Sequence, residues 1–327
     1  MKRIITKKIA PIALLSCLAL LLAFLFLKAT PEPERPPLRV EWTYWPGFYP
    51  MAIAVESGLF EKYGVKIEPL LYDSGAKARS DFSAKRLDGA MLATGDILQL
   101  ATEMPIKIVL LVDNSAGADQ VVAKAEIASV ADLRGKRVGY TPGDFGELFV
   151  IRMLEQNSLT TRDVTLVTMK SEEVLDALGK DLIKAGNTWE PYASKAVSAG
   201  HHVIFTSAST PGLIVDTVMF HASVVKERPA DIRAFVKAWF EAVEFWEKNP
   251  EIAARMIAKQ TGLKPEEVSK EGVKLFTLTE NKVAFKRSQD LTSVHTSTQA
   301  YIDLFVAKGT LSSIPKLDEL FDPSFLE

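Results

Sequence analysis

The chain has 327 residues, with 39 lysines and arginines against 41 aspartates and glutamates, and one cysteine, Cys17. This nearly neutral balance, with no basic block, argues against nucleic acid as a partner. The lone cysteine excludes an internal disulfide and a thiolate metal cluster. The approximately 290 residues that follow the N-terminal segment suffice for two lobes, each with its own core.

The N-terminal segment is expected to direct the protein out of the cytoplasm. Lysines and arginines precede an uncharged, mostly apolar run from Ile9 to Leu27, which as a helix would reach about 28 Å, close to the thickness of a bilayer core. Positive charge on that side predicts that the remainder lies outside the cytoplasm. Three interpretations stay open: an uncleaved anchor, a cleaved signal peptide, or a lipoprotein signal that makes Cys17 the lipidated residue. The Pro-rich stretch 28–37 reads as a tether.

An aromatic segment follows the first predicted strand. Residues 38–42 alternate apolar and polar as a half-buried strand does, and 50–63 have helical spacing. Five aromatic residues fall within 42–50, at the carboxyl end of that strand, where open α/β sheets bind ligands. We therefore predict that Trp45, Phe48 and Tyr49 line a cleft. Trp42 is in phase with the apolar strand positions and is predicted to be core.

The chain continues as alternating strands and helices up to about residue 206. This alternation implies βαβ units and mostly parallel sheets flanked by helices. The predicted strands are 65–72, 89–93, 106–112, 121–123, 137–140, 164–169 and 203–206. After a last strand near 213–218 the sequence predicts a helical tail, with an apolar stripe over 232–246. Such a chain crosses into a second lobe and returns.

Three strand-to-helix junctions carry residues suited to ligand binding: 73–75, 94–96 and 141–146. Unpaired N–H groups and the positive end of a helix dipole meet there, which favours an anion. Ordinary capping explains each junction singly, but together with the aromatic segment they predict a shared cleft. The candidate ligand-binding residues at these junctions are Ser74, Thr94, Gly95, Asp96, Gly143, Asp144 and Phe145.

Catalytic motifs are missing from the sequence. There is no phosphate-binding loop, no HExxH and no GxSxG, and the four histidines are scattered. We therefore expect no catalytic residues, no cofactor, no metal site and no enzyme activity.

Read in order, the segments resemble a known group of proteins. The run 46–65 resembles the opening of ABC-transporter solute-binding proteins of the nitrate, sulfonate, bicarbonate and thiamine-pyrimidine group. Matches continue at 87–90, 113–119, 132–136, 189–192 and 211–216, so the resemblance extends from about Leu38 to the end. The related pyrimidine synthases carry a cysteine-rich motif that this chain lacks.

The resemblance implies an α/β, two-lobed, type II periplasmic-binding-protein-like fold with a helical C-terminal tail. Residues 1–37 would be the signal or anchor and tether, 38–120 plus 214–327 a discontinuous lobe 1, and 121–213 lobe 2. One departure concerns Lys184, which stands where the group usually has an aspartate in a lobe 2 strand. That strand is expected to be irregular, and Lys184 either faces solvent or brings positive charge near the cleft.

The implied function is solute capture outside the cytoplasm. A small anionic or zwitterionic solute (nitrate-, sulfonate- or taurine-like) would bind between the lobes, drive hinge closure and pass to an ABC permease with its ATPase. The protein would act as a monomer at the outer face of the cytoplasmic membrane, in the periplasm or extracellular space. Trp189, Glu190 and Tyr192 would contact the solute from lobe 2, with Asp113, Ser115 and Asp216 near the crossings. A membrane-tethered sensor and a binder of a thiamine-pyrimidine precursor remain alternatives.

Overall fold

The computed structural model describes residues 35–327, and residues 37–327 form one compact unit. The predicted anchor and the lipidation site Cys17 lie outside the described residues. Within residues 35–327, no helix combines the length and apolar character needed to cross a membrane.

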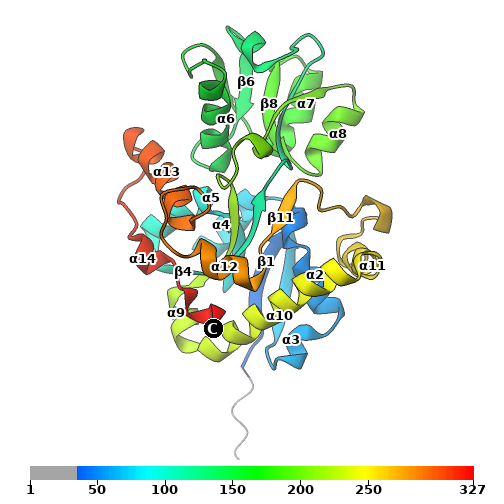
Figure 1. Ribbon diagram of the computed structural model, residues 1–327, viewed down its shortest axis with the longest axis vertical. Helices are drawn as coiled ribbons and strands as arrows, with labels where there is room; N and C mark the ends of the chain where they lie inside the picture. The colour runs from blue at the N-terminus through cyan, green and yellow to red at the C-terminus, as the bar shows by residue number, and fades with distance from the viewer. Residues whose placement is uncertain (1–34) are drawn as a thin grey trace, which may run out of the picture. The chain divides into compact units, whose positions relative to one another are not determined.

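The first sheet contains six strands from both ends of the described chain (Figure 1). Their order is β11-β4-β10-β3-β1-β2. The strand β1 pairs in parallel with β2 and β3, whereas β10 runs antiparallel to β3 and β4. The bounds are β1 Leu38–Thr43, β2 Ile67–Tyr72, β3 Gly89–Ala93, β4 Ile106–Ser115, β10 Val215–His221 and β11 Val273–Leu275.

The second sheet contains five strands from the middle of the chain, in the order β7-β6-β8-β5-β9. The strand β6 is parallel to β7 and β8, and β5 is antiparallel to β8 and β9. The bounds are β5 Asp119–Ala123, β6 Arg137–Tyr140, β7 Thr165–Thr168, β8 Ala185–Trp189 and β9 His202–Thr206.

Both sheets are mixed, which corrects the expectation of mostly parallel sheets. The reason is the chain path: β5 follows β4 after a short connection, and β10 begins the return from the second sheet. The strands β5 and β10, through which the chain crosses between the sheets, are therefore antiparallel to their neighbours. The strands β1 to β4, β10 and β11 belong to one sheet and β5 to β9 to the other. The exact residue bounds of the two lobes stay a prediction.

The strand β8 is regular, which corrects the expectation, based on Lys184, of an irregular strand here. It pairs with β5 residue for residue, from Asp119 opposite Trp189 to Ala123 opposite Ala185. Lys184 precedes the strand, and its Nζ lies 3.0 Å from Glu126 Oε1 and 2.6 Å from Asp181 Oδ1. Its charge is therefore held by partly exposed carboxylates and does not reach the pocket described below.

Helices cover the faces of both sheets. Helices α6, α7 and α8 pack on the second sheet, and α2 packs on α10 and α11 beside the first (Figure 1). The helix bounds are α2 Pro50–Glu56, α3 Leu59–Lys62, α4 Gly75–Ser83, α5 Thr94–Glu103, α6 Phe145–Gln156, α7 Val174–Gly179, α8 Tyr192–Ser198, α9 Ala222–Glu227, α10 Pro229–Lys248, α11 Pro250–Thr261, α12 Leu278–Ala284, α13 Val294–Ala307 and α14 Leu317–Leu320.

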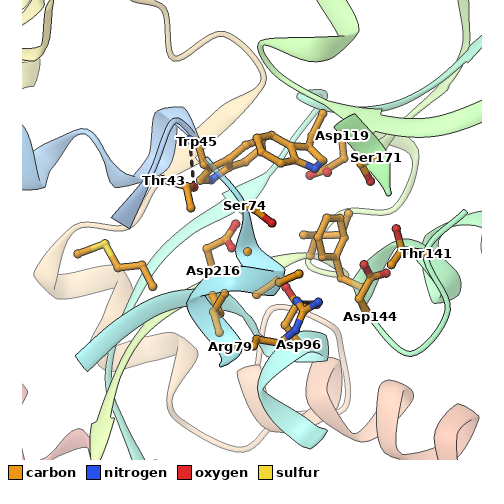
Figure 2. A pocket seen from close by; sticks show the side chains of 18 of the residues that line it. Thr43, Trp45, Ser74, Arg79, Asp96, Asp119, Thr141, Asp144, Ser171 and Asp216 are labelled. Atoms are coloured by element: carbon orange, nitrogen blue, oxygen red, sulfur yellow. Dashed lines mark hydrogen bonds and ion pairs between the residues drawn. The ribbon is translucent and has the colours of Figure 1, made fainter. Parts of the chain in front are cut away.

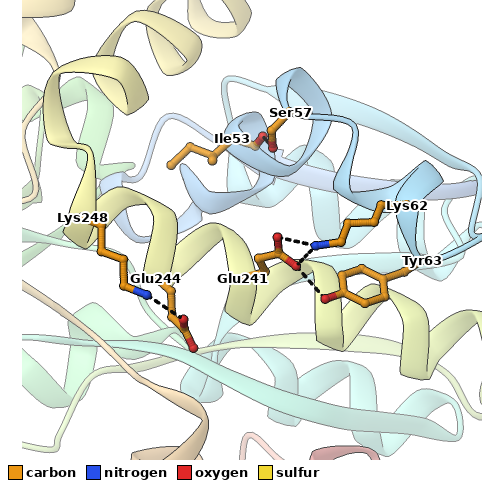
Figure 3. A network of polar contacts seen from close by, with 7 residues as sticks. All are labelled: Ile53, Ser57, Lys62, Tyr63, Glu241, Glu244 and Lys248. Atoms are coloured by element: carbon orange, nitrogen blue, oxygen red, sulfur yellow. Dashed lines mark hydrogen bonds and ion pairs between the residues drawn. The ribbon is translucent and has the colours of Figure 1, made fainter.

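The long helix α10 carries the predicted apolar stripe into the core. Phe235 stacks on Phe60 with ring centroids 5.4 Å apart, and it meets Phe220 edge-on at 5.5 Å. At the rim of this contact, Glu241 accepts hydrogen bonds of 2.6 Å from Lys62 Nζ and Tyr63 Oη (Figure 3). Apolar packing thus holds α10 in place, and a polar contact fixes the adjoining α3.

Candidate functional site

A pocket that opens to solvent lies where the two sheets face each other, with about 750 Å³ of empty space in and at the mouth of it. The strands β1, β3, β6 and β8 end there, and the antiparallel crossing strands β5 and β10 begin there. Side chains from both sheets therefore meet at one place (Figure 2). The lining residues are Thr43, Trp45, Phe48, Ser74, Gly75, Ala76, Arg79, Met91, Leu92, Ala93, Asp96, Asp119, Thr141, Asp144, Phe145, Lys170, Ser171, Glu172, Trp189, Ile214 and Asp216.

Two tryptophans from opposite sheets form the aromatic wall of the pocket. Trp45 follows β1 and Trp189 ends β8, and their rings meet edge-on with centroids 6.3 Å apart. The Trp45 ring is held from behind by a 3.0 Å hydrogen bond from its Nε1 to Asp113 Oδ2. Gly47 makes this arrangement possible, because a Cβ at that position would lie 1.7 Å from Asp113 Oδ2.

Five buried aspartates surround the pocket, and we name them the carboxyl cluster: Asp96, Asp113, Asp119, Asp144 and Asp216. All but Asp113 line the pocket, and Asp113 lies directly behind Trp45. Asp113 and Asp216 stand opposite each other on the antiparallel strands β4 and β10. The cluster therefore joins residues that are far apart in sequence.

Burial governs the electrostatics of the carboxyl cluster. Desolvation raises the pKa of Asp113 to about 8, against the opposing hydrogen bond from Trp45, and raises the pKa of Asp119 to about 7. Burial also raises the pKa of Asp96, Asp144 and Asp216, the last with help from the nearby Asp113 charge. Near neutral pH the cluster thus holds protons as well as negative charge.

Little positive charge compensates the cluster from within the pocket. Arg79 on α4 places its Nη1 3.3 Å from Asp96 Oδ1, close enough for an ion pair but without hydrogen-bond geometry. Lys170 is the other cation among the lining residues, and Glu172 adds a further carboxyl. The arrangement suits a ligand that brings hydrogen-bond donors or positive charge.

The helix N-termini that predicted anion binding are partly occupied by the chain itself. Asp144 caps α6 by accepting a 2.8 Å hydrogen bond from the Gly146 amide. The Gly143 amide donates to Glu147 Oε2 at 2.9 Å. The junction 141–146 therefore offers an anion fewer N–H groups than the sequence suggested.

Eight of the sixteen predicted ligand-binding residues line the pocket, and the other eight are not among its lining residues. The lining residues are Trp45, Phe48, Ser74, Asp96, Asp144, Phe145, Trp189 and Asp216. The others are Tyr49, Thr94, Gly95, Asp113, Ser115, Gly143, Glu190 and Tyr192.

The residues outside the pocket have partners of their own. Tyr49 packs against Trp42 and Trp246, with ring centroids 6.5 and 6.1 Å away, so it belongs with Trp42 in the core. The Ser115 hydroxyl lies 2.7 Å from Ser207 Oγ. Tyr192 meets the Trp189 ring edge-on, with centroids 4.9 Å apart, and thereby supports it.

Three more of them are fixed by backbone contacts or by packing. Glu190 accepts a 3.2 Å hydrogen bond from the Ser194 amide. Thr94 and Gly95 are buried at the start of α5, where a Cβ on Gly95 would lie 3.0 Å from the Phe145 backbone.

Sequence reasoning missed several lining residues. Lys170, Ser171 and Glu172 follow β7 and precede a helix, so they form a fourth junction of the predicted kind and could have been found by that rule. Thr43 is the last residue of β1, and Thr141 directly follows β6. Arg79 lies within a helix, one turn past the junction at Ser74, and carries no signal of its own in the sequence.

Known proteins resemble this chain in sequence and in fold. The model of the NMT1-like family matches residues 31–260. A protein of Brucella abortus named as a binding protein is 27% identical over 307 residues, which cover 90% of this chain and 93% of that one.

Solved structures show the same two-lobed fold. The periplasmic aliphatic sulphonate-binding protein SsuA from Escherichia coli has a TM-score of 0.71 at 17% identity, covering 90% of this chain and 100% of that one. The periplasmic nitrate-binding protein NrtA from Synechocystis has 0.70 at 15%, covering 90% and 88%. The desulfurization enzyme DszB also has the fold, with 0.67 at 17%, covering 89% and 98%. The predicted periplasmic-binding-protein fold is confirmed, and the match over most of its length shows that the chain belongs to the NMT1-like family.

Proposed function

We propose that this protein is the extracytoplasmic solute-binding component of an ABC importer and acts by binding, not by catalysis. One observation carries the proposal: a single pocket takes its walls from both sheets, at the strand ends where α/β folds bind ligands. Relatives named as binding proteins, and structural neighbours named as sulphonate- and nitrate-binding proteins, support it.

Solute binding would drive closure of the two sheets toward each other. A solute in the pocket would contact Trp45 from the first sheet and Trp189 from the second, and the edge-on contact of the two rings shows how close the sheets come here. A solute that touches both sheets favours the closed arrangement over one in which the sheets are further apart. Such differential contact is what allows a ligand to shift a hinge equilibrium. The connections between β4 and β5 and between β9 and β10 are the candidate hinges. The closed form would then deliver the solute to a permease at the outer face of the membrane.

The charge of the pocket favours a solute that contains an amine over a plain anion. Four aspartates and Glu172 line it, against Arg79 and Lys170. Nitrate or a simple alkanesulfonate would meet mainly carboxyl groups there. A zwitterion of the predicted taurine type fits better, because its amine can face the carboxyls while Arg79 or Lys170 receives its acidic end.

A flat amino-heterocycle, such as a thiamine-pyrimidine precursor, is the second candidate. The observation in its favour is the pair of indole rings beside hydrogen-bond acceptors, since aromatic rings are large, rigid contact surfaces for flat ligands.

Substitution at Trp45 tests whether the pocket is the binding site. We expect taurine or an aminopyrimidine, screened together with nitrate, bicarbonate and alkanesulfonates, to raise the melting temperature of the wild-type protein. A ligand at 100 times its Kd stabilises by about 2.7 kcal/mol. Trp45→Ala removes the aromatic wall and should abolish this rise while the protein still melts cooperatively.

Trp45→Phe serves as the second variant, because truncation of a buried tryptophan alone costs about 3–5 kcal/mol. The phenylalanine retains a ring but loses the hydrogen bond to Asp113, so it should stay folded and bind more weakly. If both variants respond to the solute as the wild type does, or if no compound stabilises the wild type, the proposed site is wrong.

A further inference from the structure

We propose that the carboxyl cluster exchanges a proton for the positive group of the solute. An organic cation, such as a protonated amine or an amidinium group, would bind against Asp119 and Asp216 and expel a proton to the solvent, and protonation would release the cation. This inference rests on the proposed function and names the ligand chemistry and the regulation of the same pocket.

The first argument is the convergence of acids on one point of the fold. Asp113 and Asp216 face each other across β4 and β10, and Asp119 begins β5. Asp96 lies in α5, and Asp144 is the N-cap residue of α6. The cluster therefore comes from separate elements around the pocket (Figure 2). Like charges so close together cannot all ionise without a cation between them.

The second argument is that the elements packed around Asp216 supply mostly acid. Asp113 on β4, Asp119 on β5 and Asp96 on α5 all raise its pKa through their charges. Tyr301 on α13 is buried next to the cluster and donates its hydroxyl to the Leu213 carbonyl at 3.1 Å. The nearby groups also include Arg79, Asp144, Lys170, Glu172 and Glu190. Of these, Arg79 and Lys170 are cations, and Arg79 faces Asp96.

The third argument is the presence of buried polar atoms that have no hydrogen-bond partner. Oδ1 of Asp96, which lines the pocket, is one of them: Arg79 Nη1 lies 3.3 Å away but without hydrogen-bond geometry. Both amide atoms of Asn187 are unpartnered as well, and this residue stands two positions before Trp189, on the same face of β8. Buried polar groups in native proteins are normally satisfied. A ligand with several N–H donors would satisfy the Asp96 oxygen directly.

The fourth argument identifies the cation as organic. The cluster is bounded by Trp45, Phe48, Phe145 and Trp189, so a bound cation would lie against ring faces and apolar surface. Indole faces attract organic cations by about 0.5–2 kcal/mol. A flat cation would therefore use the carboxyls and both tryptophans together.

The pKa values give the direction of the pH effect. With pKa values of about 8 for Asp113 and about 7 for Asp119, the free protein holds protons at neutral pH. A cation lowers these pKa values, so protons leave as it binds. If one proton is released, affinity rises up to about tenfold per pH unit between about pH 6 and pH 8.

A matched set of probes tests the exchange on the full chain: benzamidinium, benzamide and benzoate, which share one shape and differ in charge. Calorimetric titration in phosphate and in Tris reports proton release, because the two buffers differ in ionisation enthalpy. We expect benzamidinium to bind with release of a proton, several-fold or more tightly at about pH 8 than at about pH 6. Benzoate should not bind.

Two variants and a control assign the effect to the cluster. Asp119→Asn and Asp216→Asn should each weaken benzamidinium binding at least tenfold and reduce the proton release. Asp176→Asn changes an exposed acid on α7 that pairs with Lys180, and it should titrate as the wild type does.

The failure of this inference can be told apart from failure of the proposed function. Tighter binding of benzoate, benzamidinium binding without proton release, or no binding of any of the three probes would each overturn the exchange. If a solute from the screen still binds in a Trp45-dependent way, the proposed function survives that result. If no solute binds, both fail.

Discussion

The carboxyl groups of this protein fall into two contrasting sets. At the surface, Glu241 is bound by Lys62 and Tyr63, and Asp181 by Lys124 and Lys184, and these hydrogen bonds lower the pKa of both acids. In the carboxyl cluster, desolvation prevails and the pKa of every member is raised. The surface acids thus have lysine partners, whereas most acids around the pocket have no cationic partner within the described part of the chain.

The carboxyl cluster, unlike the surface acids, leaves electrostatic free energy available to a ligand. A buried carboxyl that lacks a partner destabilises its ionised form. A ligand that brings positive charge removes this penalty, so the same feature that strains the free protein favours the complex. The paired acids at the surface carry no such penalty, so a cationic ligand would gain little by binding to them.

Apart from truncation of Trp45, the largest effect of a single substitution on stability is expected where the cluster meets the aromatic wall, at Gly47. Gly47→Ala forces a methyl group onto Asp113 Oδ2, so Asp113 or Trp45 must move. We expect a loss of about 1–3 kcal/mol in the free energy of unfolding, as for overpacked cores, measured by urea denaturation. Gly179→Ala is the matched control, since nothing lies within 4 Å of a Cβ there. Equal stability of the two variants would mean that the Asp113–Trp45 contact is not as described.

The pH dependence of stability comes next, and its sign separates the two sets. A carboxyl whose pKa is raised on folding stabilises the folded state most below its unfolded pKa, near 4, and this contribution is lost as pH rises toward about 8. Each such group changes the free energy of unfolding by up to about 1.4 kcal/mol per pH unit. Asp113→Asn should flatten this slope in unfolding curves recorded across the window. A slope that stays the same, or becomes steeper, would refute the raised pKa of Asp113.

The smallest effect is expected at the surface and has the opposite sign. Glu241→Gln should cost about 0.2–1 kcal/mol at neutral pH, as exposed ion pairs do. Because the pKa of Glu241 is lowered, its contribution is present above the unfolded pKa and disappears as pH falls through the folded one. Thermal melts at neutral and acidic pH measure this. A difference that grows on acidification would contradict the account of the surface set.

The sequence predicted the fold well because its signals are local. Strand β3 and strand β6 have the predicted bounds, and Trp42 is buried as its phase with Leu38 indicated. Gly262 ends α11 in the left-handed conformation at φ 75°, as expected of a helix terminator. The antiparallel course of β5 and β10 depends on where the chain crosses between sheets, which alternation alone does not reveal.

The candidate site was only half predictable for a similar reason. Trp45 and Phe48 line the pocket close to the end of β1, whereas Tyr49 packs against Trp246, and a contact so distant in sequence leaves no local signal. The carboxyl cluster gathers acids between positions 96 and 216 through the topology of both sheets. Its burial, and therefore its charge state, could be seen only in the folded chain.

Identification of the natural solute tests the central claim most directly. The protein can be purified from its own cells without denaturation, and the small molecule it retains can be identified by native mass spectrometry. We predict a flat or zwitterionic compound with a basic nitrogen, lost from Trp45→Ala and Asp216→Asn. A retained solute that is purely anionic, such as nitrate or a sulfonate without an amine, would contradict the claim that the carboxyl cluster binds the positive group of the solute.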